Sequence, residues 1–173
     1  VNAFPICLDT QDTEEIIKTV VNIAPAFGGI NLEDISAPRC FEIETRLKEL
    51  LDIPVFHDDQ HGTAIVVLSG IINALKVVNK EKEDCKVIVN GAGSAGIAIT
   101  KLLLRYGFKD VTLCDKSGIL SKNSKDLNWM QKEMMEVTNL TGKTGTLADA
   151  LKGADIFVGV SAPGIVSEDM VKS

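Results

Sequence analysis

The sequence lacks several features that would place it in other classes of protein. No Lys/Arg cluster is dense enough to follow a nucleic-acid backbone, and the formal net charge is −6, so we expect no nucleic-acid partner. No apolar run reaches the roughly 18–20 residues that a bilayer span needs, because residues 64–78 are interrupted by Asn73 and Lys76. The N-terminus has no basic region before its apolar stretch, as a signal peptide would. We therefore expect a cytoplasmic protein with no membrane partner.

Cysteine pairs are also missing. Four cysteines, Cys7, Cys40, Cys85 and Cys114, are far apart, with no CxxC motif and no Cys/His cluster. This spacing argues against a disulfide framework or a zinc site and predicts reduced, mostly buried thiols. Hydrophobic residues make up 45% and charged residues 24% of the chain, the balance of a globular protein with a proper core.

The first third of the chain alternates between strand and helix patterns. Strands are predicted over residues 3–8, 30–35 and 53–56, with helices over 13–24 and 38–51. Such alternation favours a parallel sheet. Because the chain begins at Val1 rather than Met and stops at Ser173 soon after a turn, both ends are expected to be cuts through a longer protein.

A long apolar helix and a charged break follow this first series. Residues 60–79 are apolar on several faces, which predicts a buried helix, and residues 80–84 are charged. We expect three parts: a catalytic-domain segment over 1–58, a connecting buried helix over 59–82, and a dinucleotide-binding domain over 83–173.

The last part repeats the alternation. Its fold class is α/β, with a Rossmann-like arrangement, and no internal repeat is visible. The predicted strands cover 86–90, 111–114 and 156–160, the predicted helices cover 94–106, 125–137 and 146–152, and residues 116–124 are predicted as a polar loop.

A glycine run follows the first of these strands: Gly91, Ala92, Gly93, Ser94, Ala95 and Gly96. GxGxxG alone is a weak signal, but a strand before it and a helix after it are the context of a dinucleotide site. Gly91 permits the tight turn, Gly93 lets the backbone approach a pyrophosphate, and Gly96 lets helix and strand pack closely. The helix N-terminus then faces the phosphates. The competing interpretation is a structural turn.

Asp115 ends the second strand, 19 residues after Gly96, where a carboxylate would accept hydrogen bonds from the adenosine ribose. A carboxylate there disfavours a 2′-phosphate and so favours NAD, although Lys116 and Ser117 could bind the phosphate of NADP. The loop at Val160 and Ser161 follows a later strand and either borders the cofactor or is a plain turn.

Two acidic pairs, Glu33-Asp34 and Asp58-Asp59, stand where predicted strands end. The carboxyl ends of parallel strands form one edge, and carboxylates that meet there repel each other unless a cation neutralises them. Oxygen ligands favour Mg²⁺ or Mn²⁺. If both Glu33 and Asp34 bind metal, the backbone must already be turning there, because neighbouring strand residues face opposite ways. The alternative is that these acids are simply solvated.

Two longer strings give a family resemblance. Residues 27–35, FGGINLEDI, and residues 54–64, PVFHDDQHGTA, resemble the malic enzymes, most closely the smaller bacterial type, and the resemblance covers essentially the whole chain. It implies oxidative decarboxylation of malate to pyruvate and CO₂ with reduction of NAD or NADP, and a homo-oligomer, either a dimer or a tetramer.

The resemblance also implies particular residue roles. In that family Glu33, Asp34 and Asp59 match the protein ligands of the divalent metal, and Asp58 matches a neighbouring aspartate that supports the site. The range 92–95 matches the cofactor phosphate loop, and Thr63 lies beside the dinucleotide.

The family's lysine base and tyrosine acid match positions upstream of Val1, so we expect this chain alone to lack acid–base catalysis, a loss of about 10²–10⁴-fold per group. Two other interpretations stay open. One is a nucleotide-binding module without catalysis, and the other is a metal-independent dehydrogenase of similar architecture. The acidic strings argue against the second.

Overall fold

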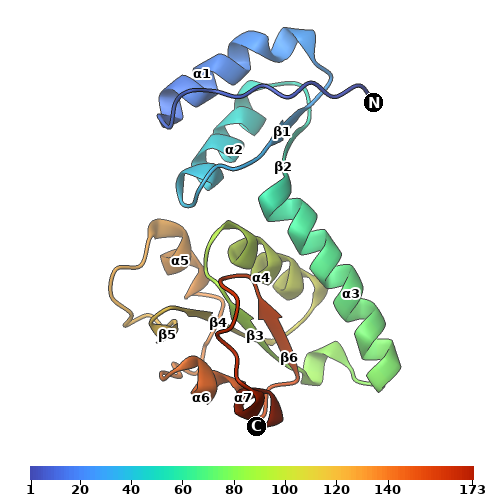
Figure 1. The fold of residues 1–173 in the computed structure, drawn as a ribbon, viewed down its shortest axis with the longest axis vertical. Helices are drawn as coiled ribbons and strands as arrows, with labels where there is room; N and C mark the ends of the chain where they lie inside the picture. Colours follow the sequence, from blue (N-terminus) through green and yellow to red (C-terminus); the bar gives the residue numbers. More distant parts are fainter. The chain divides into compact units, whose positions relative to one another are not determined.

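A computed structural model describes all 173 residues, which form two compact units, Val1–His57 and Asp58–Ser173. The first unit contains two parallel strands, and Ile30 pairs with Val55 while Leu32 pairs with His57. This pairing confirms the parallel arrangement predicted for the first third. The elements of this unit are α1 (Thr13–Ile23), the 3₁₀ helix η1 (Ala24–Ala26), β1 (Ile30–Leu32), α2 (Arg39–Leu50) and β2 (Val55–His57) (Figure 1).

The core of the first unit lies between its two helices and two strands. Apolar residues four apart on each helix, such as Ile16 and Val20 or Ile43 and Leu47, form one face and are buried against the strands. Burying such a side chain stabilises the fold by about 1.5–3 kcal/mol. The remaining buried members of this core are Ile17, Leu32 and Val55.

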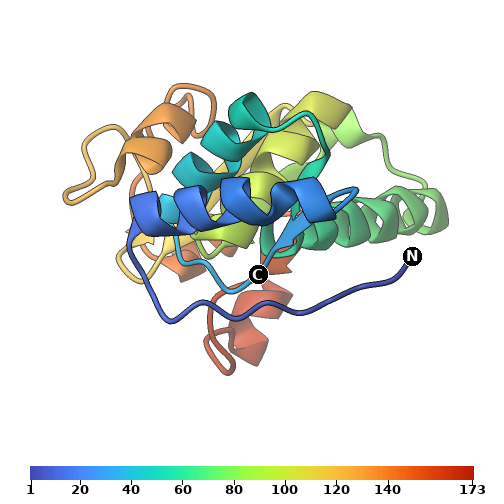
Figure 2. The same ribbon diagram turned by 90° about the horizontal axis from the view of Figure 1, so that it is seen from above.

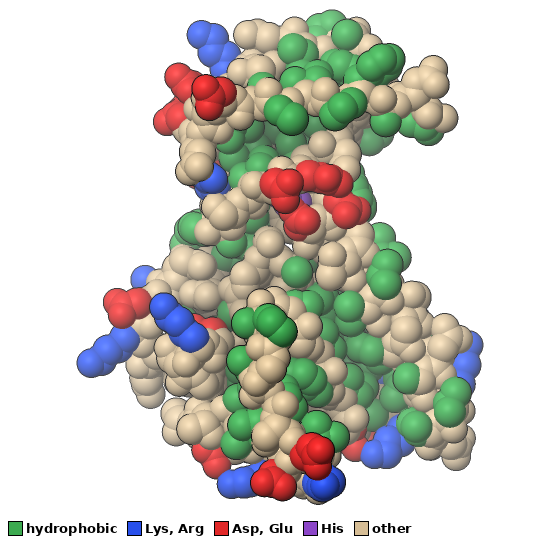
Figure 3. Space-filling model, viewed as in Figure 1, with side chains coloured by type: hydrophobic (Ala, Val, Ile, Leu, Met, Phe, Trp, Pro, Cys, Tyr) green, Lys and Arg blue, Asp and Glu red, His purple; other side chains and the backbone are tan.

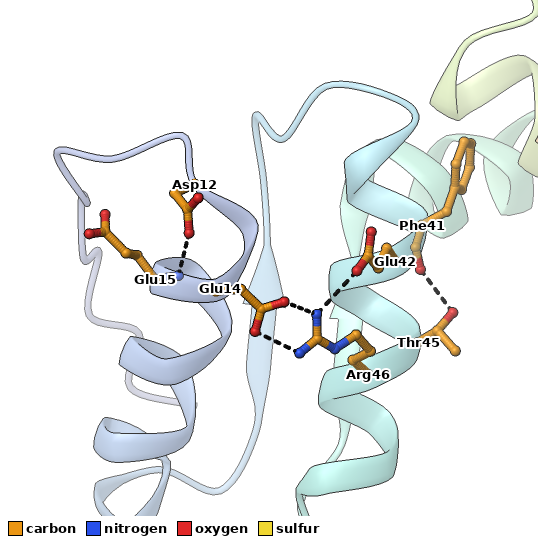
Figure 4. A network of polar contacts seen from close by, with 7 residues as sticks. All are labelled: Asp12, Glu14, Glu15, Phe41, Glu42, Thr45 and Arg46. Atoms are coloured by element: carbon orange, nitrogen blue, oxygen red, sulfur yellow. Dashed lines mark hydrogen bonds and ion pairs between the residues drawn. The ribbon is translucent and has the colours of Figure 1, made fainter. Parts of the chain in front are cut away.

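Polar contacts join the two helices at the surface (Figure 4). Asp12 caps α1 by accepting a hydrogen bond from the Glu15 N–H at 2.9 Å. Arg46 on α2 donates to both carboxylate oxygens of Glu14 and to Glu42 at 3.1 Å. The guanidinium holds the pKa of Glu14 below its ordinary value. Because these groups are exposed, they orient the helices more than they stabilise them.

The predicted strand over residues 3–8 is absent. These residues run as an exposed, extended segment, and Phe4 keeps 71% of its surface accessible (Figure 2). A strand needs a neighbour for its backbone groups, and no strand of this chain pairs with the segment. Pro5 also lacks the N–H that a ladder would use.

The second unit contains a four-stranded sheet in the order β5-β4-β3-β6. Strand β3 is parallel to both β4 and β6, and β4 is antiparallel to the short β5, which lies within the predicted loop. Its elements are the π-helix η2 (Asp58–Gly62), α3 (Thr63–Val78), the 3₁₀ helix η3 (Lys82–Asp84), β3 (Lys86–Asn90), α4 (Ser94–Tyr106), β4 (Asp110–Asp115), β5 (Gly118–Ile119), α5 (Trp129–Met134), α6 (Leu147–Leu151), β6 (Ile156–Gly159) and α7 (Glu168–Lys172).

Helices cover both faces of this sheet. Ile88 and Cys114 pack with Leu151 of α6 on one face, whereas α4 contacts β3 and β4. Residues 87–89 are completely buried, as expected for a parallel strand covered on both sides. The structure therefore confirms the predicted α/β class.

Helix α3 differs from two predictions, that of a buried helix and that of no apolar run long enough for a bilayer span. It is largely exposed rather than buried, and its main contacts within this chain are with η2 and α4. Val66 and Val77 remain 70% and 85% exposed, and hydrophobic side chains are visible along this helix in Figure 3. Together η2 and α3 give 21 helical residues, Asp58–Val78, with mean hydropathy 1.6, which by length and composition is enough for a membrane span. One such helix is by itself weak evidence for a membrane span.

The cysteines lead to a direct prediction. Cys7 is exposed, whereas the other three are buried. Burial raises the pKa of the Cys114 thiol to about 12, and only the thiolate reacts. Ellman's reagent at pH 8 should therefore label one thiol per folded chain rapidly and all four in denaturant. Rapid labelling of Cys114 without denaturant would contradict its burial beneath α6.

Candidate functional site

The glycine run forms the connection between β3 and α4. Strand β3 ends at Asn90, and α4 begins at Ser94 as the sequence predicts. Gly91 has a φ of +121°, which favours glycine, and its N–H donates to the Cys114 carbonyl at 2.8 Å. The chain therefore leaves the sheet through a tight turn at the carboxyl edge.

Two glycines of the run are required by close backbone contacts. A Cβ on Gly91 would lie 2.6 Å from the Val160 carbonyl oxygen, and a Cβ on Gly96 would lie 1.6 Å from the Gly91 carbonyl oxygen. A Cβ on Gly93 would meet nothing within 4 Å. The turn is thus closed against the protein at Gly91 and Gly96 and open at Gly93.

The loop after β6 lies against this turn. Val160 donates its N–H to the Asn90 carbonyl at 2.9 Å, and the Asn90 side-chain amide donates to Ser161 Oγ at 2.9 Å. Val160 and Ser161 are therefore brought beside Gly91. Asn90 was not singled out in the sequence, because a polar residue at the end of a strand carries no specific signal.

Asp115 ends β4, the strand next to β3. Because Asn90 pairs with Cys114, the residues that follow them, Gly91 and Asp115, lie next to each other at the carboxyl edge of the sheet. The Asp115 side chain is half-buried, and its Oδ1 accepts a hydrogen bond from the Ser117 N–H at 2.7 Å. The carboxylate is thus held at the edge where the turn begins.

The N-terminus of α4 has no side-chain cap. The first N–H groups of a helix have no partner within the helix, and together with the helix dipole they attract anionic oxygens. The open side of Gly93 leaves room for such a group. The turn, the helix end and Asp115 form a site suited to a phosphate diester with a ribose beside it.

The first acidic pair directly follows β1. The strand ends at Leu32, and Asp34 has a left-handed φ of +56°. The backbone has therefore left the strand conformation at the two residues that would have to bind the same metal ion. Asn31 donates to Glu33 Oε1 at 3.1 Å. The second acidic pair directly follows His57, the last residue of β2, and belongs to the second unit.

The second acidic pair begins η2, the π-helix that packs against α4 in the second unit. A Cβ on Gly62 would lie 2.2 Å from Asp58 Oδ1, so the missing side chain provides the space that this carboxylate occupies. Thr63 begins α3 immediately afterwards. No three His, Cys, Asp or Glu side chains of the chain are arranged as a metal site.

The two histidines take different positions. His57 is fully buried at the end of β2, whereas His61 is half-buried in η2.

A glycine turn between parallel strands, an uncapped helix N-terminus and an acid at the end of the next strand define the second unit as a Rossmann-like dinucleotide-binding domain. Residues 60–173 match the family described as "Malic enzyme, NAD binding domain", and residues 4–48 match "Malic enzyme, N-terminal domain". The chain belongs to the malic enzymes.

Individual relatives agree with this assignment. The NAD-dependent malic enzyme of Geobacillus stearothermophilus is 59% identical over 99% of this chain and 36% of its own length. The NADP-dependent malic enzyme of Haemophilus influenzae is 46% identical over the whole chain and 23% of its own length. The crystal structure of the NAD-dependent malic enzyme from Thermotoga maritima superposes with a TM-score of 0.96, at 49% identity, over 99% of this chain and 46% of that one. The chain thus spans less than half of these relatives.

Proposed function

We propose that the second unit binds NAD through the turn at Gly91–Gly96, with the pyrophosphate at the N-terminus of α4 and the adenosine ribose at Asp115. The observation that carries this proposal is the contrast between Gly91 and Gly96, which are closed against backbone, and Gly93, which is open. Val160, Ser161 and Thr63 would border the cofactor. NADP is the alternative, because relatives are named for either cofactor.

We further propose that Glu33, Asp34 and Asp59 hold Mg²⁺ or Mn²⁺. All three offer carboxylate oxygens, the ligands that these hard cations prefer. The left-handed backbone at Asp34 supports the proposal, since it frees two adjacent acids from the alternation of a strand. Asp58 would support this site from the position that Gly62 leaves open for it.

The reaction we propose for the longer protein is oxidative decarboxylation of malate to pyruvate and CO₂. NAD would accept the hydride, and the metal would supply Lewis-acid polarisation. Residues of this chain would orient the cofactor and supply the carboxylates that bind the metal. The acid–base groups would come from outside residues 1–173. We also propose a cytoplasmic homo-oligomer that acts on a small-molecule substrate.

Cofactor choice can be tested at Asp115. Titration of the chain with NADH should give a fluorescence change at submillimolar concentration, and NADPH should bind more weakly. Asp115→Ala should weaken NADH by about tenfold, the cost of losing a hydrogen bond to a charged group, and should reduce the preference over NADPH. Asp110→Ala, at the other end of β4, serves as the control and should change neither affinity. No response to millimolar NADH would overturn the proposal.

Metal binding can be tested with Mn²⁺ and electron paramagnetic resonance. Asp59→Ala should weaken Mn²⁺ binding by at least about tenfold, because it removes one of three anionic ligands. Asp52→Ala removes an exposed carboxylate outside the proposed set and should leave the affinity unchanged. Equal Mn²⁺ affinities for Asp59→Ala and the unmodified chain would show that the ligand assignment is wrong.

A further inference from the structure

A glutamine far along the chain holds the backbone of the glycine turn. Gln131 Nε2 donates a hydrogen bond to the Ala92 carbonyl oxygen at 3.0 Å, across 39 positions of sequence. Ala92 is 6% exposed and lies between the two glycines that begin the turn. The contact therefore acts on the part of the backbone that would approach a pyrophosphate.

The other atoms of the Gln131 amide are also fixed. Gln131 Oε1 accepts from the Asn128 N–H at 3.1 Å, and Asn128 Oδ1 accepts from the Gln131 N–H at 2.9 Å. These reciprocal bonds form the capping box that begins α5. Met130 and Met134 are buried and attach the helix to the unit. The side chain thus reaches the turn from a firmly held helix end.

Holding the Ala92 carbonyl has a consequence for the next residue. The peptide bond is planar and trans, so the Gly93 N–H points opposite to the Ala92 C=O and is directed away from Gln131. Gly93 is the N-cap residue of α4, where no side chain satisfies the helix end. Gln131 therefore limits the rotation of a peptide whose N–H is available to an anion.

We infer that Gln131 is a positioning residue for pyrophosphate binding, which prepares the Ala92–Gly93 peptide before the dinucleotide arrives. The inference rests on the proposed function, because it assigns Gln131 to the same turn. Preparing a binding loop in its bound conformation raises affinity by reducing the ordering cost of binding. The effect should be confined to ligands that carry phosphate.

The test compares two variants that each remove part of the capping box. Gln131→Met has a similar shape but loses the bond to Ala92, whereas Asn128→Ala loses the bond to the Gln131 N–H and leaves the Ala92 contact in place. We expect Gln131→Met to raise the Kd of NADH and of ADP by about fivefold, as for one hydrogen bond, and to leave adenosine binding unchanged. Asn128→Ala should lower the Tm but leave the Kd of NADH within about twofold.

A spectroscopic readout separates positioning from general destabilisation. In ligand-free ¹H–¹⁵N spectra, Gln131→Met should shift the Gly93 and Ser94 amide signals, and Asn128→Ala should not. If Gln131→Met leaves both these signals and the Kd of NADH unchanged, or if both variants weaken NADH equally, the inference is wrong. Failure of the unmodified chain to bind NADH would overturn the proposed function and this inference together.

Discussion

Replacement of Gly96 by Ala is expected to cost the second unit about 3 kcal/mol or more in free energy of unfolding. The added Cβ would lie 1.6 Å from the Gly91 carbonyl oxygen and 2.9 Å from its carbon, so α4 must move away from the turn. The clashing atoms belong to the backbone and cannot rotate aside as a side chain could. Thermal unfolding followed by circular dichroism should show a fall in Tm of about 10 °C.

Gly70→Ala is the matched control for this substitution. Gly70 also lies inside a helix, but a Cβ there would meet nothing within 4 Å. Alanine in an exposed helix interior is favoured over glycine by up to about 1 kcal/mol, so the Tm should stay constant or rise. Equal Tm values for the two variants would contradict the close packing between α4 and the turn.

Replacement of Gly93 by Ala is expected to abolish most NADH binding while the fold remains intact. Gly93 has φ −90° and ψ −159°, a conformation that alanine adopts without strain, and its Cβ would occupy open space. That space is where the proposed pyrophosphate would approach the backbone. The loss of one or two hydrogen bonds to a charged group predicts an increase in Kd of about 10–100-fold by fluorescence titration.

The Tm distinguishes the two glycine positions. Gly93→Ala should unfold at the same temperature as the unmodified chain, whereas Gly96→Ala should not. An unchanged Kd for Gly93→Ala would place the dinucleotide elsewhere in the molecule. A lower Tm would instead mean that Gly93 is needed for the fold, as we expect of Gly96.

The sequence predicts the βαβ unit well because several signals there agree. The buried strand at 86–90, the glycine run and the helix from Ser94 each favour the same connection, and Asp115 ends the next strand as expected. Each acidic pair directly follows a strand, β1 or β2, as the sequence predicts. Local pattern and fold agree at these positions.

Other features depend on contacts that no local pattern contains. Residues 3–8 have the composition of a strand, but pairing requires a partner that this chain lacks. The apolar character of α3 predicts burial, but burial also depends on the elements that pack against it. Asn128 and Gln131 could have been read as a capping box, yet the reach of Gln131 to Ala92 is a tertiary contact between distant segments.

The π-helix η2 takes up one extra residue between the second acidic pair and helix α3. A π turn holds one residue more than an α turn, and Asp58–Gly62 lies immediately before the regular helix at Thr63. One i→i+5 turn carries the chain round about as far as one i→i+4 turn. Deleting one residue within η2, for example Gln60, would therefore restore an α-helical count and leave Asp58 at about the same angle around the axis of α3. Deleting one residue from the regular helix after Thr63 would instead rotate Asp58 and Asp59 by about 100° relative to the part of α3 that follows. The residue count of the regular helix α3 is therefore as restrictive as the identities of the acids: a one-residue deletion there would turn both carboxylates away from their present direction relative to the rest of the helix, even though every acidic side chain was kept.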